Sequence, residues 1–335
     1  MNQFIVLLAL CSAGDVKQSG DPGVVKRLRE EYPPAARRLI GDLQNVELKI
    51  RRRRHWMSGK ENHFIERLTR KGYSILRDAS IDPDSKTPTW RVLCRTRSKM
   101  FNLTKAEASG PFILVSQEVC DPSSDESFML GIYVEPFVDC ATSIAGNTLV
   151  DLLAAPTFEV KNAREVNEGG HQVVVFEFSG TITSANHQLD AEGTVKLDPG
   201  IGWPITMLDV KARPRVLAGM VPGLESMSMF SRSEMTYKTD GGKPSLKTYH
   251  ERFSSSIKRS YQEDQVEVLE SKYGSVTDDQ FTLQAFGLPE VPLRPRPASG
   301  FFSWKSPALW ISLSLCVITF GSLVLFRSRS RERPV

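Results

Sequence analysis

An uncharged apolar run close to the C-terminus constrains this chain more than any other feature. Residues 309–326 read LWISLSLCVITFGSLVLF, 18 positions without a charge and with four small polar residues. A helix of that length rises about 27 Å, close to the roughly 30 Å hydrocarbon thickness of a bilayer. A buried core helix this long would ordinarily carry one polar face. We therefore expect a transmembrane helix over residues 308–326.

The charges on either side of this run predict its orientation. Residues 327–335 read RSRSRERPV and hold four arginines against one glutamate, whereas the nearest charge on the other side is Lys305. Positive residues collect on the cytoplasmic side of membrane helices, and indole rings such as Trp304 and Trp310 favour the interface. The sequence thus predicts a single-pass protein of the cell membrane, with a basic cytoplasmic tail at 327–335 and everything before residue 308 extracytoplasmic.

This orientation requires export, and the first residues resemble an export signal. Residues 1–14 hold an apolar stretch from Phe4 to Leu10, followed by small residues around Ala13. We expect a signal peptide over this segment. Without a signal the chain would be tail-anchored with its bulk in the cytosol, but four arginines would then have to cross the membrane.

Averaged over the whole chain, the composition is that of an ordinary water-soluble protein. The 335 residues are 40% hydrophobic and 24% charged, with a net charge of +4 and a mean hydropathy of −0.25. A polytopic membrane protein, a collagen or a highly charged disordered chain would depart far from these values. Cysteine leaves two alternatives open: either Cys120 and Cys140 form a disulfide and Cys94 is left over, or all three are unpaired and buried.

The pattern between residues 34 and 253 predicts an α+β domain, a mostly antiparallel sheet with a few helices on one face. Helical spacing marks 34–43 and 147–154, where Pro34 suits a first turn and Asn147 suits a cap. Alternating segments between Gly, Pro, Asp and Ser clusters mark the strands. They lie at 46–50, 63–68, 73–78, 90–96, 101–105, 112–119, 157–163, 171–178, 193–197, 205–212, 233–239 and 246–253.

Polar segments flank this domain on both sides. Residues 15–33 are expected to form a polar lead-in. Beyond Phe253 the periodicity fades, and prolines at 289, 292, 295 and 297 favour an extended chain. We therefore expect a polar, Pro-rich stalk over residues 254–307 that leads to the membrane.

One stretch of the domain resembles a known family. From Val173 to Lys211 an apolar strand, VVVFEFSG, is followed by a second strand that ends in LDP, a Gly-containing turn and a strand that opens with Pro-Ile. This arrangement resembles the bacterial outer-membrane lipoprotein carrier superfamily, and the segments SEMTYKT and LKTYHERF fit the same meander. The resemblance would extend from Pro34 to Phe253, although the specific part is about 40 residues long.

The resemblance implies a strongly curved open half-barrel whose concave apolar face, beneath covering helices, holds acyl chains. Members of that superfamily carry lipoproteins across the periplasm or sense envelope stress. A shuttle must diffuse freely, so the C-terminal anchor of this chain speaks against shuttling and leaves binding as the expected activity.

Two sets of apolar residues are candidates for contact with such a ligand. Alternation places Val174, Phe176 and Phe178 on one face of a strand. A Met-rich stretch from residue 220 to 235 supplies the second set, because flexible Met side chains suit varied apolar ligands. Its candidate residues are Met220, Met227, Met229 and Phe230. The alternative is that this second set simply packs against the sheet.

A basic run indicates a second kind of surface. Residues 23–71 hold 14 Lys and Arg against 6 Asp and Glu, and residues 49–54 read KIRRRR. On a strand, Arg51 and Arg53 would face opposite to Arg52 and Arg54. These four arginines would form a basic surface for anionic headgroups, acidic glycans or an acidic envelope protein. The alternative is a solvated edge strand guarded by charge.

Motifs for catalysis are sparse: residues 255–258 match SxxK, but its usual companion motifs do not occur. The five histidines show no metal-ligand spacing, and no GxSxG, P-loop or dinucleotide fingerprint occurs. We therefore expect no enzyme, no metal, no cofactor and, for an exported domain, no nucleic acid. The expected function is a membrane-anchored extracytoplasmic protein that binds a lipid or other apolar ligand on a concave sheet. The alternative is an envelope protein-interaction or regulatory module that acts through the basic surface.

Overall fold

A computed structural model describes residues 20–56, 58–83, 89–105, 107, 109–119, 139–184, 187–215, 228–240, 243–256 and 260–292. The chain separates into a unit that ends at Glu290 and a C-terminal unit from Val291. The expected signal peptide (1–14), membrane helix (308–326) and tail (327–335) lie outside the described residues. No helix within the described ranges is long and apolar enough to cross a membrane.

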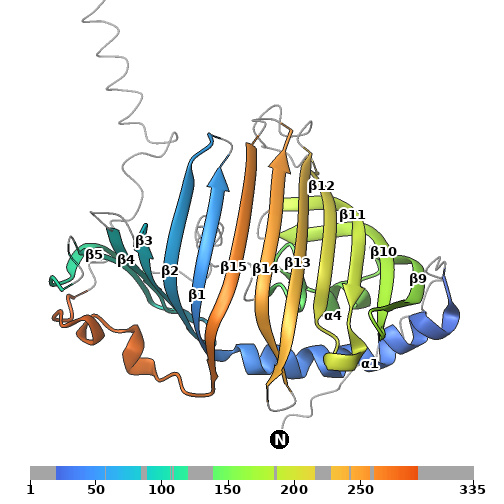
Figure 1. The fold of residues 1–335 in the computed structure, drawn as a ribbon, viewed down its shortest axis with the longest axis horizontal. Coiled ribbons are helices and arrows are strands. Elements are labelled where there is room, and N and C mark those ends of the chain that lie inside the picture. The colour runs from blue at the N-terminus through green and yellow to red at the C-terminus, as the bar shows by residue number, and fades with distance from the viewer. Residues whose placement is uncertain are drawn as a thin grey trace, which may run out of the picture. The chain divides into compact units, whose positions relative to one another are not determined.

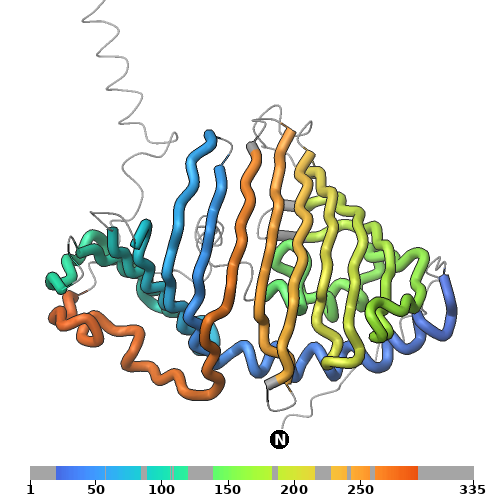
Figure 2. The backbone as a smooth tube through the Cα atoms, viewed as in Figure 1, coloured from blue at the N-terminus to red at the C-terminus, as the bar shows by residue number. Residues whose placement is uncertain are grey.

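The first unit is built on one large antiparallel sheet that curves and stays open (Figures 1 and 2). Its 13 strands follow the order β6-β5-β4-β3-β2-β1-β15-β14-β13-β12-β11-β10-β9. This confirms the predicted α+β class with a mostly antiparallel sheet. The strands are β1 (Asn45–Trp56), β2 (Glu61–Lys71), β3 (Ser74–Ile81), β4 (Thr89–Arg95), β5 (Lys99–Lys105), β6 (Ile113–Val119), β9 (Phe158–Glu168), β10 (His171–Ser184), β11 (His187–Leu197), β12 (Ile205–Pro214), β13 (Met229–Asp240), β14 (Lys243–Ser255) and β15 (Ser260–Tyr273).

The smaller elements connect or cover these strands. β7 (Ser143–Ile144) and β8 (Asn147–Thr148) form a separate two-stranded ribbon. The helices are α1 (Pro22–Leu43), α4 (Leu149–Ala154) and the 3₁₀ turns η1 (Pro199–Ile201), η3 (Asp278–Phe281) and η4 (Gln284–Phe286). The expected turn after the LDP segment lies between β11 and β12, where Asp198 Oδ1 accepts from the backbone N of Gly200 at 2.9 Å.

β15 corrects the predicted end of the domain. Residues 260–273 were expected to lie in the stalk, but they form a central strand that pairs with β1 on one side and β14 on the other. The strand carries many charges and only two buried valines, Val266 and Val268, so its alternation is easily missed. Described structure continues through η3 and η4 to Glu290, which leaves only the part beyond it for a stalk.

Helix α1 begins twelve residues earlier than predicted. The sequence favoured a start at Pro34, whereas the helix starts at Pro22, where Asp21 Oδ1 accepts from the backbone N of Gly23 at 2.8 Å. Pro33 and Pro34 lie inside the helix. The buried positions Val24, Leu28 and Tyr32, among others, continue one apolar face toward the N-terminus, and packing of that face outweighs the prolines. Similarly, Thr148 rather than Asn147 caps α4.

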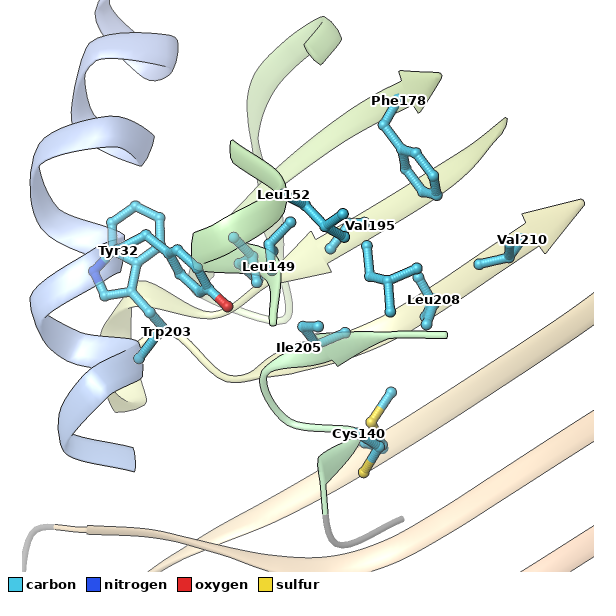
Figure 3. Packing of buried hydrophobic residues seen from close by; sticks show 14 of the residues in the cluster. Tyr32, Cys140, Leu149, Leu152, Phe178, Val195, Trp203, Ile205, Leu208 and Val210 are labelled. Atoms are coloured by element: carbon cyan, nitrogen blue, oxygen red, sulfur yellow. The ribbon is translucent and has the colours of Figure 1, made fainter. Parts of the chain in front are cut away.

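The core is divided between the two faces of the sheet. We call the face that packs against α1 and α4 the inner face. Figure 3 shows Tyr32 of α1 and Leu149 of α4 directed toward residues of the sheet such as Val195 and Leu208. On the opposite, outer face, Leu76, Cys94 and Phe101 of β3 to β5 pack against the 276–288 segment, which includes Phe281 and Leu283. Both faces of the sheet therefore carry buried apolar side chains.

The outer face of the central strands carries ion pairs. The contacts of Glu263 in one of them predict how the stability of the fold depends on pH. Glu263 accepts from the hydroxyl of Tyr261 at 2.8 Å and lies 2.6 Å from His250 Nε2. Chiefly through the Tyr261 hydrogen bond, followed by His250, the pKa of Glu263 falls from 4.5 to about 2. A carboxyl whose pKa is lower in the folded state contributes stability above its unfolded pKa and loses it as the pH falls toward the folded value.

We therefore expect the Glu263→Gln variant to lose less stability than the unaltered chain as the pH falls from 4.5 to 2. The check is the urea midpoint as a function of pH. Tyr261→Phe should move the acid limb upward toward pH 4.5, since it removes the largest cause of the shift. An unchanged slope in the Glu263→Gln variant would contradict the assignment.

Candidate functional site

The inner face changes character along the central strands. On β1, Val46, Leu48 and Ile50 belong to the core, but the next residues on the same face are Arg52 and Arg54. The inner-face residues of the neighbouring strands also change from apolar to charged at this level. On β15 the residue next to Val266 on this face is Asp264, and on β2 the residue next to Leu68 is Glu66. A charged band thus bounds the apolar core on this face. We call Arg52, Arg54, Glu66, Arg77, Glu251 and Asp264 the ionic band.

Asp264 is the centre of the ionic band. Its carboxylate accepts from Arg52 Nη2 at 2.6 Å and from Arg54 Nε at 2.7 Å, with a further bond from Gln262 Nε2 at 3.0 Å. Arg52 and Asp264 are each only 2% exposed. Desolvation raises the pKa of Asp264, and the charge of Arg52 opposes that rise. Two arginines on one carboxylate keep this buried charge paired.

The other two carboxylates of the band also have partners. Arg77 Nε donates to Glu66 Oε2 at 3.0 Å, and Glu66 is fully buried. Glu251 accepts from the hydroxyls of Tyr249 at 2.8 Å and Ser231 at 2.9 Å. Burial raises the pKa of Glu251. On the inner face these contacts link β13 to β14, β15 to β1, and β2 to β3.

A pocket of about 430 Å³ lies beside the ionic band, over β1 to β4. Register places Phe64, Ala79, Ile81 and Leu93 on the inner face, where they form an apolar floor. Polar and charged residues surround it. They are Arg54, Lys60, Asn62, Arg77, Asp82, Thr89 and Arg91. Among the described lining residues, the pocket thus combines a small apolar floor with a larger polar rim.

The charges of this pocket are unevenly matched. Arg54 is bound to Asp264 and Arg77 to Glu66. Asp82 is occupied by the backbone N of His63 at 3.0 Å and by Asn62 Nδ2 at 3.4 Å. Lys60 and Arg91 are exposed, and their side chains make no ion pair or hydrogen bond that involves the described residues. Two cations at the rim are therefore available to a ligand.

A second pocket of about 420 Å³ lies over β9 to β12 and is lined mainly by polar residues. Its lining ionic groups are partly matched, since Lys211 Nζ lies 3.0 Å from Glu192 Oε1. Within the described ranges, no group of three or more His, Cys, Asp or Glu side chains is arranged to hold a metal ion. The first pocket is the better candidate for an apolar ligand.

The predicted ligand residues do not gather at this pocket. Val174, Phe176 and Phe178 share one face as expected, but they are buried in the core and line neither pocket. Met229 is half-buried and packs against the same core, and Phe230 is 44% exposed on the opposite side of β13. Met220 and Met227 lie outside the described residues. The described positions are therefore divided between the core and the outer face of β13.

The predicted basic surface is corrected as well. Arg51 and Arg53 do face opposite to Arg52 and Arg54, but all four have acidic partners. Arg51 bonds to Glu267 and Arg53 to Glu61, while Arg52 and Arg54 share Asp264. β1 is also a central strand rather than an edge strand. The run KIRRRR is thus matched by acidic residues of β15 and β2 and presents no free basic patch.

The cysteine alternatives are settled only in part. Cys94 and Cys140 are both buried, and Cys94 Sγ lies 3.7 Å from the carbonyl of Phe281. Cys120 lies outside the described residues, so pairing with it stays a prediction.

Comparison with known proteins finds similar solved structures. A LolA superfamily protein from Nitrosomonas europaea matches with a TM-score of 0.35 and 10% sequence identity, over 78% of this chain and 96% of that chain. It belongs to the superfamily that residues 173–211 resemble. No family model and no curated protein matches the chain.

Proposed function

We propose that this chain is a membrane-anchored, extracytoplasmic binding protein that holds a lipid or other apolar ligand on the inner face of its sheet. The observation that carries the proposal is the pocket over β1 to β4, with its floor of Phe64, Ala79, Ile81 and Leu93. Its volume of about 430 Å³ lies within the range of small-ligand sites.

The ionic band limits where such a ligand lies. Glu66 and Arg77 separate the pocket floor from Leu68 and the main core. Parting this band would leave buried charges without partners, which is costly. An alkyl chain therefore occupies the pocket rather than the space among Val174, Phe176 and Phe178.

Membrane anchorage and the absence of catalysis are part of the same proposal. Anchorage rests on the apolar run at 308–326 and on the arginines that follow it. The alternative of an interaction module acting through Arg51 to Arg54 is not favoured, because these arginines are held by Glu267, Asp264 and Glu61.

The test uses the full chain in a nonionic amphipol, titrated calorimetrically with dodecyl maltoside below its micellar concentration. The double variant Ile81→Asn/Leu93→Asn should weaken binding by about tenfold or more, since each change removes apolar contact worth roughly 1 kcal/mol. The matched control is Ile113→Asn/Val115→Asn, two exposed residues of β6 that do not line the pocket. No binding by the unaltered chain, or equal loss in both variants, would overturn the proposal.

A further inference from the structure

We infer that the tip of the β1–β2 hairpin docks on the surface of an anionic lipid bilayer and brings the pocket to that surface. This inference rests on the proposed function and names the partner with which the pocket exchanges its ligand. We call Trp56, Ser58, Gly59 and Lys60 the hairpin tip. They lie at the upper end of β1 in Figure 1, and all four are exposed.

Trp56 gives the hairpin tip an apolar ring. Its Nε1 donates to Asn62 Oδ1 at 3.3 Å, and the guanidinium of Arg54 lies 5.3 Å from the ring centre. These contacts hold the indole in place but leave the residue 37% exposed, more than Trp90 or Trp203. An indole combines an apolar body with one polar group, and the interface between membrane and water favours such rings.

Lys60 adds a positive charge beside this ring. Its backbone carbonyl accepts from the backbone N of Trp56 at 2.9 Å, so the two residues face each other across the hairpin. The Lys60 side chain makes no ion pair with a described residue. Glu61 does not neutralise it, because Glu61 is on the opposite face of β2 and bonds to Arg53 at 2.5 Å. Basic groups of this kind are attracted to bilayers that contain anionic lipids.

The hairpin tip is continuous with the pocket. Lys60 itself lines the pocket, and so do Arg54 and Asn62, the two residues that contact Trp56. The apolar floor begins at Phe64, the next inner-face position of β2 after Asn62. A lipid that leaves a bilayer at the hairpin tip would therefore reach the floor without crossing the ionic band.

The proposed anchor is compatible with this contact. Residues 293–307 separate the described chain from the apolar run at 308–326, and in extended form they span at most roughly 50 Å. The 12 residues of β1 extend over about 40 Å. The tether is thus at least as long as the central strands, and it leaves the choice of the docking surface to the chemistry of that surface.

The experiment mixes the full chain in a nonionic amphipol with preformed vesicles and measures co-flotation. One set of vesicles is phosphatidylcholine alone, and the other also contains phosphatidylglycerol. We expect about fivefold stronger binding to the anionic vesicles, the gain from one Lys near such a surface. Lys60→Gln should remove this preference. Trp56→Ala should weaken binding to both kinds of vesicle by about tenfold, because the exposed part of the indole no longer leaves water.

The control variant Tyr73→Ala/Arg97→Gln removes an aromatic ring and a cation from the opposite end of the sheet. Tyr73 is 71% exposed in the turn between β2 and β3, and the guanidinium of Arg97 lies 4.5 Å from its ring centre. This variant should bind both kinds of vesicle as the unaltered chain does, and melting curves should show that all variants fold. An equal loss in the control and in Trp56→Ala would overturn the inference.

Two further outcomes would also overturn it. They are equal binding of the unaltered chain to both kinds of vesicle, and unchanged binding after replacement of Trp56 or Lys60. Titration of the unaltered chain with dodecyl maltoside distinguishes these failures from failure of the proposed function. Binding of dodecyl maltoside without a preference for anionic vesicles would leave the proposed function intact. Absence of dodecyl maltoside binding would overturn the proposed function, and with it the exchange of a ligand at the bilayer.

Discussion

Replacing Asp264 with Asn should lower the free energy of unfolding by about 3–5 kcal/mol, the range for removing one partner from a buried ion pair. Asp264 is the carboxylate that both Arg52 and Arg54 contact, and with Arg52 it is 2% exposed. The amide cannot balance two guanidinium charges in a site that excludes water. The measurement is the urea-unfolding curve of the full chain.

Glu267→Gln provides the matched control for this prediction. Glu267 lies on the same strand and pairs with Arg51 of the same neighbouring strand, but both side chains are more than half exposed. Its replacement should cost less than about 1 kcal/mol. Equal effects of the two replacements would show that the ionic band contributes no more than the surface pairs.

The pairing of β1 with β15 illustrates what the sequence could and could not predict. The basic alternation at Arg51 to Arg54 is visible in the sequence, and so are Glu263, Asp264 and Glu267 some 210 residues later. Only the register between β1 and β15 places Arg54 opposite Asp264 and Arg51 opposite Glu267. Because no local signal fixes that register, the sequence alone predicts either a basic surface or a charged edge strand for the arginines, and a stalk for residues 260–273. The strand that holds the arginines was predictable from its local alternation, whereas the alternation of β15 is obscured by its many charges.

The candidate site was missed for a related reason. Lys60 follows Ser58 and Gly59 in a turn between two predicted strands, and Arg91 alternates with Leu93 along a third. Taken by itself, each is an ordinary cation near a strand, and the sequence gives no sign that it lines a pocket. They become neighbours of one apolar floor only because β2, β3 and β4 pair in sequence order with their inner faces aligned. The three paired strands follow one another in the chain. Assigning alternate residues of each strand to the inner or outer face could therefore have indicated the site.

Phe178→Ala should destabilise the fold by about 3–5 kcal/mol, the usual cost of truncating a buried phenylalanine, and leave the affinity for dodecyl maltoside unchanged. Phe178 is 2% exposed, stacks on Phe158 with ring centroids 5.1 Å apart, and belongs to the core beneath α1 and α4 (Figure 3). The loss would be seen in urea unfolding. Phe230→Ala, at an exposed position of β13, should change stability by less than about 0.5 kcal/mol.

This pair of variants decides which part of the inner face holds the ligand. If alkyl chains enter the core, as the alternation of Val174, Phe176 and Phe178 suggested, truncating Phe178 should alter affinity along with stability. If the ionic band keeps the core closed, the two effects separate: Phe178 governs stability, and Ile81 with Leu93 governs binding. Calorimetric titration of the folded Phe178→Ala variant, at a temperature well below its melting point, measures the affinity without interference from the loss of stability. Reduced affinity there would place the chain of the ligand within the core and contradict the pocket over β1 to β4.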